Sequence, residues 1–284
     1  MSALDSDRTY VTHFIRKLRG GSQPILAQAS DGFLYVVKFT NNPQGRNISF
    51  NEAMGTELYQ AAGLPVPVWK PLVLTEEFLN RNNLCWIETA EGFVRPESGL
   101  CFGSRYLGGD GEKLWEILPR SSFARIANAG DFYLAWLVDI CAAHTDNRQA
   151  VFEDRPGGIQ AVFVDHGHMF SGPEGMSPRP NYRASAYLDM RIYERTSNIA
   201  QTVLDLDGDT LLRRAKHLPT GWLTDTALRN FSECLGLLAD AKAVESIVEL
   251  IAGFPVQKDQ REFLADKRQR GFPDWLLRAG VQCA

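Results

Sequence analysis

The pattern of the sequence changes about a third of the way along the chain. Residues 1–107 contain short apolar, partly β-branched runs separated by turn residues, a pattern typical of β-strands. Beyond Gly108, where the sequence Gly-Gly-Asp-Gly interrupts the strands, most segments have apolar residues at helical spacing. We therefore expect an α+β protein with two lobes. A small antiparallel sheet would form the N-terminal lobe, residues 1–107, and helices would form the larger lobe, residues 108–284.

The N-terminal part contains a hairpin signal followed by a helix signal. Two apolar runs, Ile25–Ala29 and Phe33–Phe39, flank the turn sequence Ser30-Asp31-Gly32, which predicts an antiparallel hairpin. Asn51–Ala62 then has helical spacing and is followed by Gly63, a residue type that commonly ends helices. Further strand-like runs lie at Val66–Leu74, Leu84–Glu88 and Leu100–Tyr106.

The C-terminal part begins with one very apolar segment. Phe123–Ala143 combines helical spacing with nearly continuous hydrophobicity, which predicts a buried helix. Two short strand-like runs, Ala150–Phe152 and Gln160–Val164, follow it and flank the turn sequence Arg155-Pro156-Gly157-Gly158. Further helices are predicted at Leu211–Leu218, Asp225–Leu238 and Ala241–Ile251.

Composition narrows the class of protein. The 284 residues are 44% apolar and 23% charged, so the chain can bury a sizeable core. A formal net charge of −4 gives no indication of a nucleic-acid-binding protein. The most apolar stretch, Phe132–Ala143, is too short to span a bilayer, and the start of the chain lacks the pattern of a secretory signal. Five scattered cysteines without a CxxC pair predict free thiols, and we expect a cytoplasmic protein that binds neither membrane nor nucleic acid.

Two stretches near the predicted hairpin suit phosphate binding. The turn sequence Arg19–Pro24 contains adjacent glycines, whose backbone N–H groups can face an anion without interference from a Cβ atom. Lys38 lies inside the apolar strand Val36–Phe39. Its ammonium group can either reach solvent on an open sheet face or hold nucleotide phosphates and pair with a glutamate of the following helix. That helix offers Glu52 and Glu57.

A second pair of stretches supplies carboxylates. His144–Gln149 directly follows the buried helix, and Val162–Gly167 ends the last short strand. Phosphoryl transfer requires one carboxylate near the acceptor hydroxyl and a second one, with an amide oxygen, to hold Mg²⁺. Each stretch alone also suits an ordinary turn. Their order, after a glycine-rich turn and a strand lysine, favours a phosphoryl-transfer site with Asp146 and Asp165.

Two metal sites of other kinds are weaker alternatives. Histidine and carboxylate ligands suit zinc or iron, but the candidates crowd together on short loops: His144, Asp165, His166 and His168. Asp205–Asp209 is similar to a calcium loop, yet Lys216 occupies the position of the last ligand. We expect instead a turn in which Asp209 caps the next helix.

The phosphate-binding and carboxylate stretches together resemble the HipA-like kinases, a bacterial branch of the protein-kinase-like fold. The resemblance covers about residues 12–170 and is closest at Arg19–Pro24, Val37–Phe39, Asn51-Glu52 and Gly63–Pro67. It implies a two-lobed kinase-like fold that uses ATP and Mg²⁺. The implied activity is transfer of the γ-phosphate to a Ser or Thr hydroxyl of a protein, and an antitoxin-like partner would fit this family.

The resemblance also implies roles for individual residues. Lys38 would contact the α- and β-phosphates and pair with Glu52. Asp146 would act as the base or orient the acceptor hydroxyl, and Asp165 would bind Mg²⁺. The full nucleotide-binding set would be Gly20, Gly21, Ser22, Gln23 and Lys38, with Arg105, Tyr106 and Leu107 at the hinge that receives adenine.

Two features leave alternatives open. The kinase pattern has a metal-binding asparagine five residues after the catalytic aspartate, but this chain has Val151 there. An amide oxygen for the metal would then come from Gln149 or Asn147, and a chain without one could be an ATP-binding scaffold rather than an enzyme. The acceptor could also be a small-molecule alcohol. On a helical wheel Glu57 falls inside the apolar stripe and Glu52 outside it, so both are candidates for the ion pair.

Overall fold

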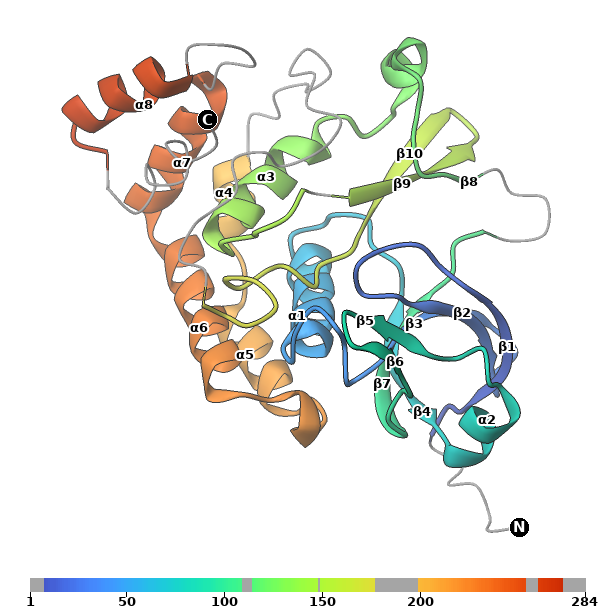
Figure 1. Cartoon of the computed structure of the whole chain (residues 1–284). Helices are drawn as coiled ribbons and strands as arrows, with labels where there is room; N and C mark the ends of the chain where they lie inside the picture. The colour runs from blue at the N-terminus through green and yellow to red at the C-terminus, as the bar shows by residue number, and fades with distance from the viewer. Residues whose placement is uncertain (1–7, 109–113, 148, 177–198, 254–259, 273–284) are drawn as a thin grey trace.

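A curled antiparallel sheet forms the N-terminal region of the computed structural model, which describes residues 8–108, 114–147, 149–176, 199–253 and 260–272 (Figure 1). The sheet has five strands in the order β1-β2-β3-β7-β4. They are β1 (Val11–Lys17), β2 (Ile25–Ala29), β3 (Leu34–Lys38), β4 (Trp69–Leu74) and β7 (Gly99–Arg105). The N–H of Val73 on one edge donates to the carbonyl of Thr9 beside the other edge at 2.8 Å, so the sheet curls toward closure.

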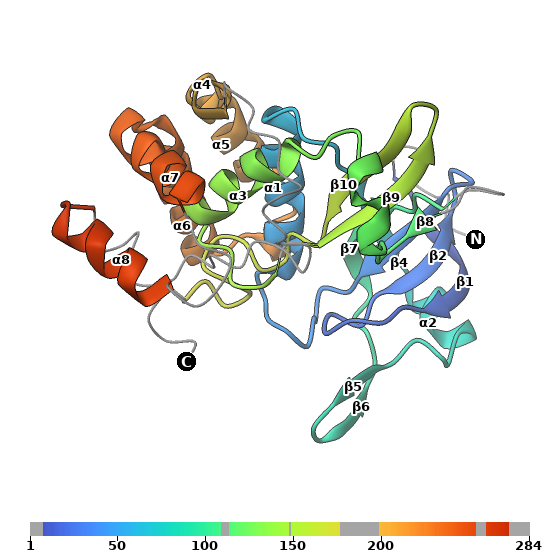
Figure 2. The same ribbon diagram turned by 90° about the horizontal axis from the view of Figure 1, so that it is seen from above.

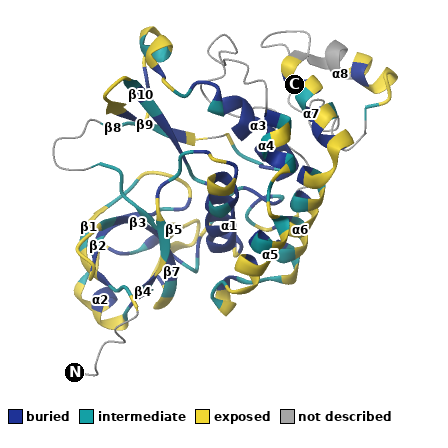
Figure 3. Cartoon of the chain, turned by 180° about the vertical axis from the view of Figure 1, so that it is seen from behind, coloured by how far each residue is buried: buried dark blue, intermediate teal, exposed yellow. Residues whose placement is uncertain are grey.

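The predicted hairpin and the helix after it are both present. β2 and β3 pair antiparallel, with Ala27 opposite Tyr35. Helix α1 (Ile48–Ala61) lies between the sheet and the helices of the C-terminal region (Figures 1 and 3). Eleven of its residues, on every side of the helix, are buried. It is therefore a core helix rather than an amphipathic surface helix.

Two small elements decorate the sheet. Helix α2 (Glu76–Arg81) starts after Thr75, whose hydroxyl accepts from the N–H of Phe78 and so caps the helix. The hairpin of β5 (Ile87–Thr89) and β6 (Gly92–Val94) projects away from the rest of the molecule (Figure 2).

A second sheet lies between the two regions. It consists of β8 (Leu114–Trp115), β9 (Gln149–Arg155) and β10 (Gly158–Val164), in the order β10-β9-β8. β9 and β10 form the second predicted hairpin, with Phe152 opposite Ala161. Because β10 ends at Val164, Asp165 directly follows this hairpin. Its carboxylate contacts Lys38 at the end of β3.

Helices form the rest of the described chain. Their bounds are α3 (Asp131–Cys141), α4 (Ile199–Leu204), α5 (Gly208–Lys216), α6 (Asp225–Ala239), α7 (Ala241–Gly253) and α8 (Gln260–Gln269), with short 3₁₀ turns η1 (Arg120–Arg125) and η3 (Thr220–Trp222). One core joins α1 to the inward faces of α3, α6 and α7, through residues such as Phe50, Trp136 and Phe231. The α+β expectation, an antiparallel sheet followed by a helical region, is confirmed.

Two expectations about helix ends are wrong. The α-helix of the apolar segment starts at Asp131 rather than at Phe123, which lies in the 3₁₀ turn η1, because the chain between them joins the second sheet. The N–H of Ala127 donates to the carbonyl of Ile159, and the Asn128 side chain exchanges hydrogen bonds with the backbone of Ala161. The residue that caps α5 also differs from the expected one.

Asp207, rather than Asp209, caps α5, since its carboxylate accepts from the N–H and the hydroxyl of Thr210.

The four cysteines within the described ranges are buried free thiols, and burial raises the pKa of each: Cys85, Cys101, Cys141 and Cys234. Cys283 lies outside the described residues.

Two kinds of feature are absent from the part of the chain that the structure describes. Its His, Cys, Asp and Glu side chains form no cluster of three or more that could hold a metal ion, so the histidine-based alternative has no support there. Its helices are all too short or too polar to cross a membrane.

Trp222 is a test of how the two regions hold together. Its fully buried ring lies 6.3 Å from that of Trp69, and its Nε1–H donates to the carbonyl of Leu100 at 3.0 Å. We expect Trp222→Ala to lower the free energy of unfolding by about 3–5 kcal/mol, because it leaves a large cavity. Trp222→Phe should cost about 1–2 kcal/mol, since Thr40 still donates to Leu100. Urea unfolding measures both.

Ile117→Ala is the matched control, because Ile117 is 78% exposed and should change the free energy of unfolding by less than about 0.5 kcal/mol. An alanine variant at position 222 that unfolds like the control would contradict a joining role for Trp222.

Candidate active site

Three charged side chains from distant parts of the sequence meet at the inner face of the N-terminal sheet. Lys38, the last residue of β3, is 6% exposed. Its Nζ atom lies 2.7 Å from Oδ1 of Asp165 and forms a close ion pair with Oε1 of Glu52. A buried ammonium group is stable only when it is paired and hydrogen-bonded, and here two carboxylates meet that requirement.

Glu52 also fixes the chain that follows Asp165. Its carboxylate accepts from the backbone N–H of Gly167 at 2.8 Å and from that of His166 at 3.2 Å. Gly167 needs to be glycine, because a Cβ atom there would lie 2.9 Å from Oε1 of Glu52 and 3.0 Å from Ile48. The Asp-x-Gly sequence thus has a local steric cause.

Glu57, the other candidate partner of Lys38, points elsewhere. Its carboxylate pairs with Arg214 of α5 and accepts from Nε1 of Trp69 at 3.0 Å. The helical wheel gave no guide, because α1 is buried on all sides and both glutamates face protein rather than solvent. The two glutamates are distinguished only by their partners, which are Lys38 for Glu52 and Arg214 for Glu57.

The charge balance of the Lys38 cluster is uneven, since two carboxylates share one ammonium group. Burial alone would raise the pKa of Asp165, but the Lys38 charge and hydrogen bond hold it well below its usual range. Burial opposes the charged form of Lys38, yet the two carboxylates raise its pKa. For Glu52, burial outweighs Lys38 and raises the pKa of the carboxyl group. The cluster therefore favours an additional cation.

Asn51, which precedes Glu52 in the Asn51-Glu52 motif, has a role that the sequence patterns did not reveal. Its side chain is fully buried, and Nδ2 donates to the carbonyls of Gly167 and Met169 at 2.8 Å and of Gly172 at 3.2 Å. Asp165 has a positive φ of 60°, a conformation that surrounding contacts must impose. Asn51 and Glu52 together supply such contacts from one turn of α1.

The glycine-rich turn closes the cleft from above. The N–H of Leu18 donates to the carbonyl of Pro24, and Gly20 and Gln23 have positive φ values of 129° and 46°. Gly20, Gly21 and Ser22 line the cleft. Gln23 instead turns toward the β5–β6 hairpin, where its amide exchanges two hydrogen bonds with the backbone of Glu88.

The cleft itself has a volume of about 620 Å³, within the range of small-molecule sites. Arg105, Tyr106 and Leu107 line it at the end of β7, with apolar side chains such as Val36 and Phe102. The N–H groups of Arg105 and Tyr106 already donate to Val68 and Leu34, so these two donors are not available to a base. Arg19 of the glycine-rich stretch also lines the cleft, as do Arg16, Gln44 and Glu116, which the sequence patterns missed.

Asp146 and Gln149 line the same cleft as Lys38 and Asp165. Gln149 and Val151 are two residues apart on β9, so their side chains share the face that borders the cleft. Asn147 is exposed, and its N–H donates to Oδ1 of Asp146 at 2.7 Å. Arg148, in the same stretch, lies outside the described residues.

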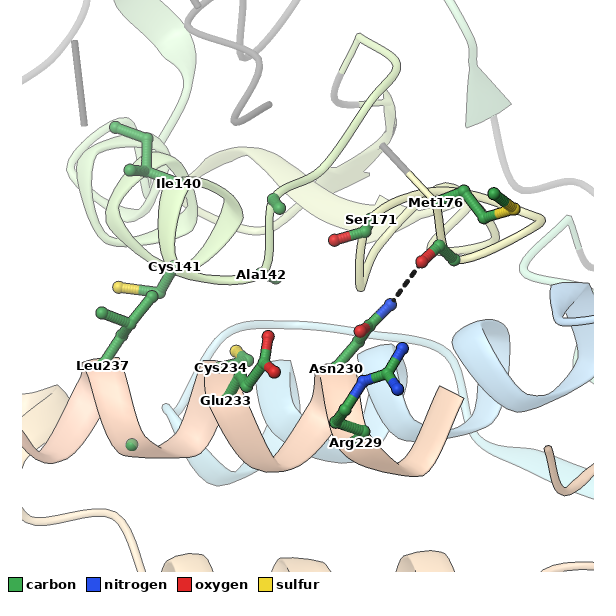
Figure 4. Close-up of a pocket in the computed structure, with 13 residues that line it drawn as sticks. Ile140, Cys141, Ala142, Ser171, Met176, Arg229, Asn230, Glu233, Cys234 and Leu237 are labelled. Atoms are coloured by element: carbon green, nitrogen blue, oxygen red, sulfur yellow. Dashed lines mark hydrogen bonds between the residues drawn. The ribbon is translucent and has the colours of Figure 1, made fainter. Parts of the chain in front are cut away.

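A second cavity, of about 590 Å³, shares none of the residues that line the cleft. It lies between the end of α3, the loop at residues 171–176 and α6 (Figure 4). Cys141 and Cys234 belong to its wall, and Asn230 donates to the carbonyl of Gly175 beside it. The charged cluster therefore belongs to the first cleft alone.

Comparisons with solved structures identify the fold. A structure of hydra Fam20 with sugar aligns with 87% of this chain and 91% of that chain, at 12% identity and a TM-score of 0.53. The Helicobacter pylori proinflammatory kinase CtkA aligns with 84% of this chain and 97% of its own, at 11% identity and a TM-score of 0.51. The Golgi casein kinase with Mn/ADP bound aligns over 85% and 73%, at 12% identity and a TM-score of 0.51.

No protein-family model matches the sequence, and no curated protein matches it either. The structural likeness extends over most of this chain and shows a protein-kinase-like fold.

Removing Lys38 should reveal the charge imbalance as a pH dependence. In the wild type the pKa of Asp165 is below its unfolded value near 4, so its ionised form stabilises the fold above about pH 4 and this contribution is lost in acid. In Lys38→Met, two buried carboxylates face each other without a cation, so their pKa values rise and ionising them costs folding free energy. The loss of unfolding free energy should be about 3–5 kcal/mol at pH 7 and clearly smaller at pH 4.5.

Urea unfolding at both pH values measures the effect, with Lys70→Met as the control. Lys70 pairs with Asp31 at 2.9 Å in a partly exposed position, so this variant should lose less than about 1 kcal/mol at either pH. An equal loss at both pH values in Lys38→Met would contradict the ionised pair of carboxylates.

Proposed function

We propose that this protein is an ATP- and Mg²⁺-dependent phosphotransferase. The observation that carries the proposal is the meeting of Lys38, Glu52 and Asp165 in one cleft, which Asp146 and a glycine-rich turn also border. Phosphoryl transfer needs mainly positioning and charge neutralisation, and these residue types supply both.

The residues present fit a nucleotide with a divalent cation. The cluster holds one carboxylate more than it has ammonium groups, so a cation would complete its charge. Mg²⁺ is commonly held by one or two carboxylates together with substrate phosphates, and a protein cluster of three ligands is not needed. Asp165 would hold the ion, with Gln149 of the neighbouring strand β9, opposite Val164, as a candidate amide ligand. When bound, the ion neutralises charge on the phosphates.

The side chains of the cleft divide the remaining work. Lys38 presents its ammonium group to the phosphates while Glu52 keeps it extended from β3. The turn at Gly20–Ser22 borders the same cleft, and backbone N–H groups of such a turn would bind phosphate oxygens. Asp146 accepts a hydrogen bond from the attacking hydroxyl, which orients the oxygen and gives its proton a carboxylate to move to.

We propose that the acceptor is a Ser or Thr hydroxyl of a protein. Support comes from the resemblance of the motifs to HipA-like kinases and from the fold shared with proteins described as a casein kinase and a proinflammatory kinase. An antitoxin-like protein is the partner class that the same resemblance suggests. These finer assignments rest on likeness, whereas the phosphotransferase assignment rests on the cleft.

Val151 favours a second candidate function, a nucleotide-binding scaffold without catalytic turnover. A valine cannot ligate a metal, and it borders the cleft on the same strand face as Gln149. The two candidates share the nucleotide site and differ only in turnover, so binding and catalysis need separate measurements.

Calorimetric titration of ATP, with and without Mg²⁺, tests the nucleotide site. We expect binding that tightens with Mg²⁺, is lost in Lys38→Ala and no longer responds to Mg²⁺ in Asp165→Asn. Lys70→Ala, a lysine outside the cleft, should bind like the wild type. Absence of ATP binding in both conditions would refute the nucleotide site and with it the phosphotransferase.

Asp146→Asn tests turnover. The amide keeps the size of the side chain but cannot take the hydroxyl proton, so ADP release from Mg-ATP should fall about 100-fold or more while ATP affinity stays within about 2-fold. Asp154→Asn, on the exposed part of β9, is the matched control and should keep wild-type turnover. If Asp146→Asn turned over at the wild-type rate, Asp146 would have no catalytic role, and a wild type that binds ATP without turnover would favour the scaffold.

A further inference from the structure

A chain of hydrogen bonds connects the glycine-rich turn to the loop that carries Asp146. It starts at Ser22, whose carbonyl accepts from the side-chain amide of Asn42 at 3.3 Å. The Asn42 side-chain oxygen accepts from the backbone N–H of Gln44 at 3.1 Å. Asn42 is 9% exposed, so these bonds are largely shielded from solvent. The turn and the segment after β3 are thereby tied together.

Gln44 continues the chain across the cleft. It lines the cleft, and its Nε2 atom lies 2.9 Å from Nε2 of His168. It also packs against the turn, because a Cβ atom on Gly21 would lie only 2.6 Å from its amide nitrogen. The glycine at position 21 therefore leaves the space that the Gln44 amide occupies.

His168 in turn contacts Thr145, the residue before Asp146. Its Nδ1 atom lies 3.3 Å from the Thr145 hydroxyl, and its carbonyl accepts from the Thr145 N–H at 3.0 Å. The hydroxyl of Thr145 also donates to the same carbonyl, at 3.3 Å. Thr145 is thus held by both the side chain and the backbone of His168.

These contacts agree on one form of the imidazole ring. With the Gln44 Nε2 group as the donor, Nε2 of His168 is the acceptor in this contact. Nδ1 then carries the proton and donates to Thr145, whose own proton goes to the His168 carbonyl. Every donor in this chain has an acceptor when the ring is neutral with its proton on Nδ1.

We infer that His168 is a positioning residue that couples the nucleotide-binding turn to the catalytic loop. This inference rests on the proposed function. A nucleotide that settles under Gly21 and Ser22 presses on the segment that holds Gln44, and the Gln44–His168–Thr145 bonds set the orientation of the residue next to Asp146. His168 touches no reacting atom in this scheme, so its loss should affect turnover and leave nucleotide affinity nearly intact.

A double-mutant cycle on Gln44 and His168 tests the coupling through kinetics. ADP release from Mg-ATP and calorimetric ATP affinity are measured for Gln44→Leu, His168→Phe and the double variant. We expect each single change to lower kcat about 10- to 100-fold with ATP affinity within about 3-fold, because small misplacements of a catalytic loop are costly. The double variant should be no slower than the slower single variant. Additive losses, or equal losses in affinity and kcat, would overturn the inference.

Matched variants separate positioning from simple stability. Thr145→Ser keeps the hydroxyl and should retain most of the turnover, whereas Thr145→Val keeps the shape and should lose as much as His168→Phe. His217→Phe removes an exposed histidine and should turn over like the wild type. If Thr145→Ser and Thr145→Val behaved alike, the hydroxyl link would have no role.

A spectroscopic measurement tests the Gln44–His168–Thr145 bridge without relying on enzyme activity. The chain has five histidines, and ¹⁵N NMR of the histidine-labelled protein, with His168→Phe to identify the signal, reports which ring nitrogen carries the proton. We expect Nδ1–H for His168 at pH 7.5 and a mixed tautomer in Gln44→Leu. An Nε2–H tautomer in the wild type would overturn the bridge. A wild type that binds no ATP but shows the expected tautomer would refute the proposed function alone.

Discussion

The buried ammonium group of Lys38 is the constraint on which the centre of the structure depends. A buried ammonium group is stable only beside close counter-charges. Here they are Glu52 on α1 and Asp165 after β10, which are 14 and 127 residues away in sequence. The sheet, the helix and the hairpin must therefore be in place together before the cluster is satisfied. Because Glu52 also binds the backbone after Asp165, the ion pair and the conformation of that loop form as one unit. The lysine and the carboxylate that we propose as phosphate and metal ligands are thus placed by the same contacts.

Helix α1 transmits this constraint to the rest of the protein. In its N-terminal half, Glu52 lines the cleft and Asn51 bonds the backbone after Asp165. Phe50 packs edge-to-face on Phe170 and Phe231 of the helical region. Its C-terminal half holds Arg214 through Glu57. A helix that is buried on all sides and bonded at both ends has little freedom to swing. The contact between Lys38 and Glu52 is therefore a fixed property of the packing.

Much of the local structure could be predicted from the sequence, but its long-range contacts could not. The hairpin around Asp31-Gly32 depends on neighbouring residues, so its turn residues and apolar runs were sufficient. The start of α3 could not be located, since the competing partner of its first residues is the distant strand around Ile159. The roles of Gln44 and His168 were hidden for the same reason: a glutamine in a loop carries no signal until the fold brings a histidine to it. Glu52 and Glu57 illustrate the limit, because five residues along one helix separate an ion pair of the cleft from a partly exposed ion pair between α1 and α5.

The same geometry bears on whether the cleft can hold a second metal ion. Gln149 and Val151 share a strand face, and two residues of a strand span about 7 Å. The one extra methylene of a glutamine, compared with an asparagine, is too short to bring its amide to the place that an asparagine at 151 would reach. Along the paired strands, Gln149 lies opposite Val164, the residue before Asp165, whereas Val151 lies opposite Val162. The departure at Val151 thus leaves Gln149 as an amide beside Asp165 on this strand face, and it leaves the contact between Asp165 and Lys38 untouched.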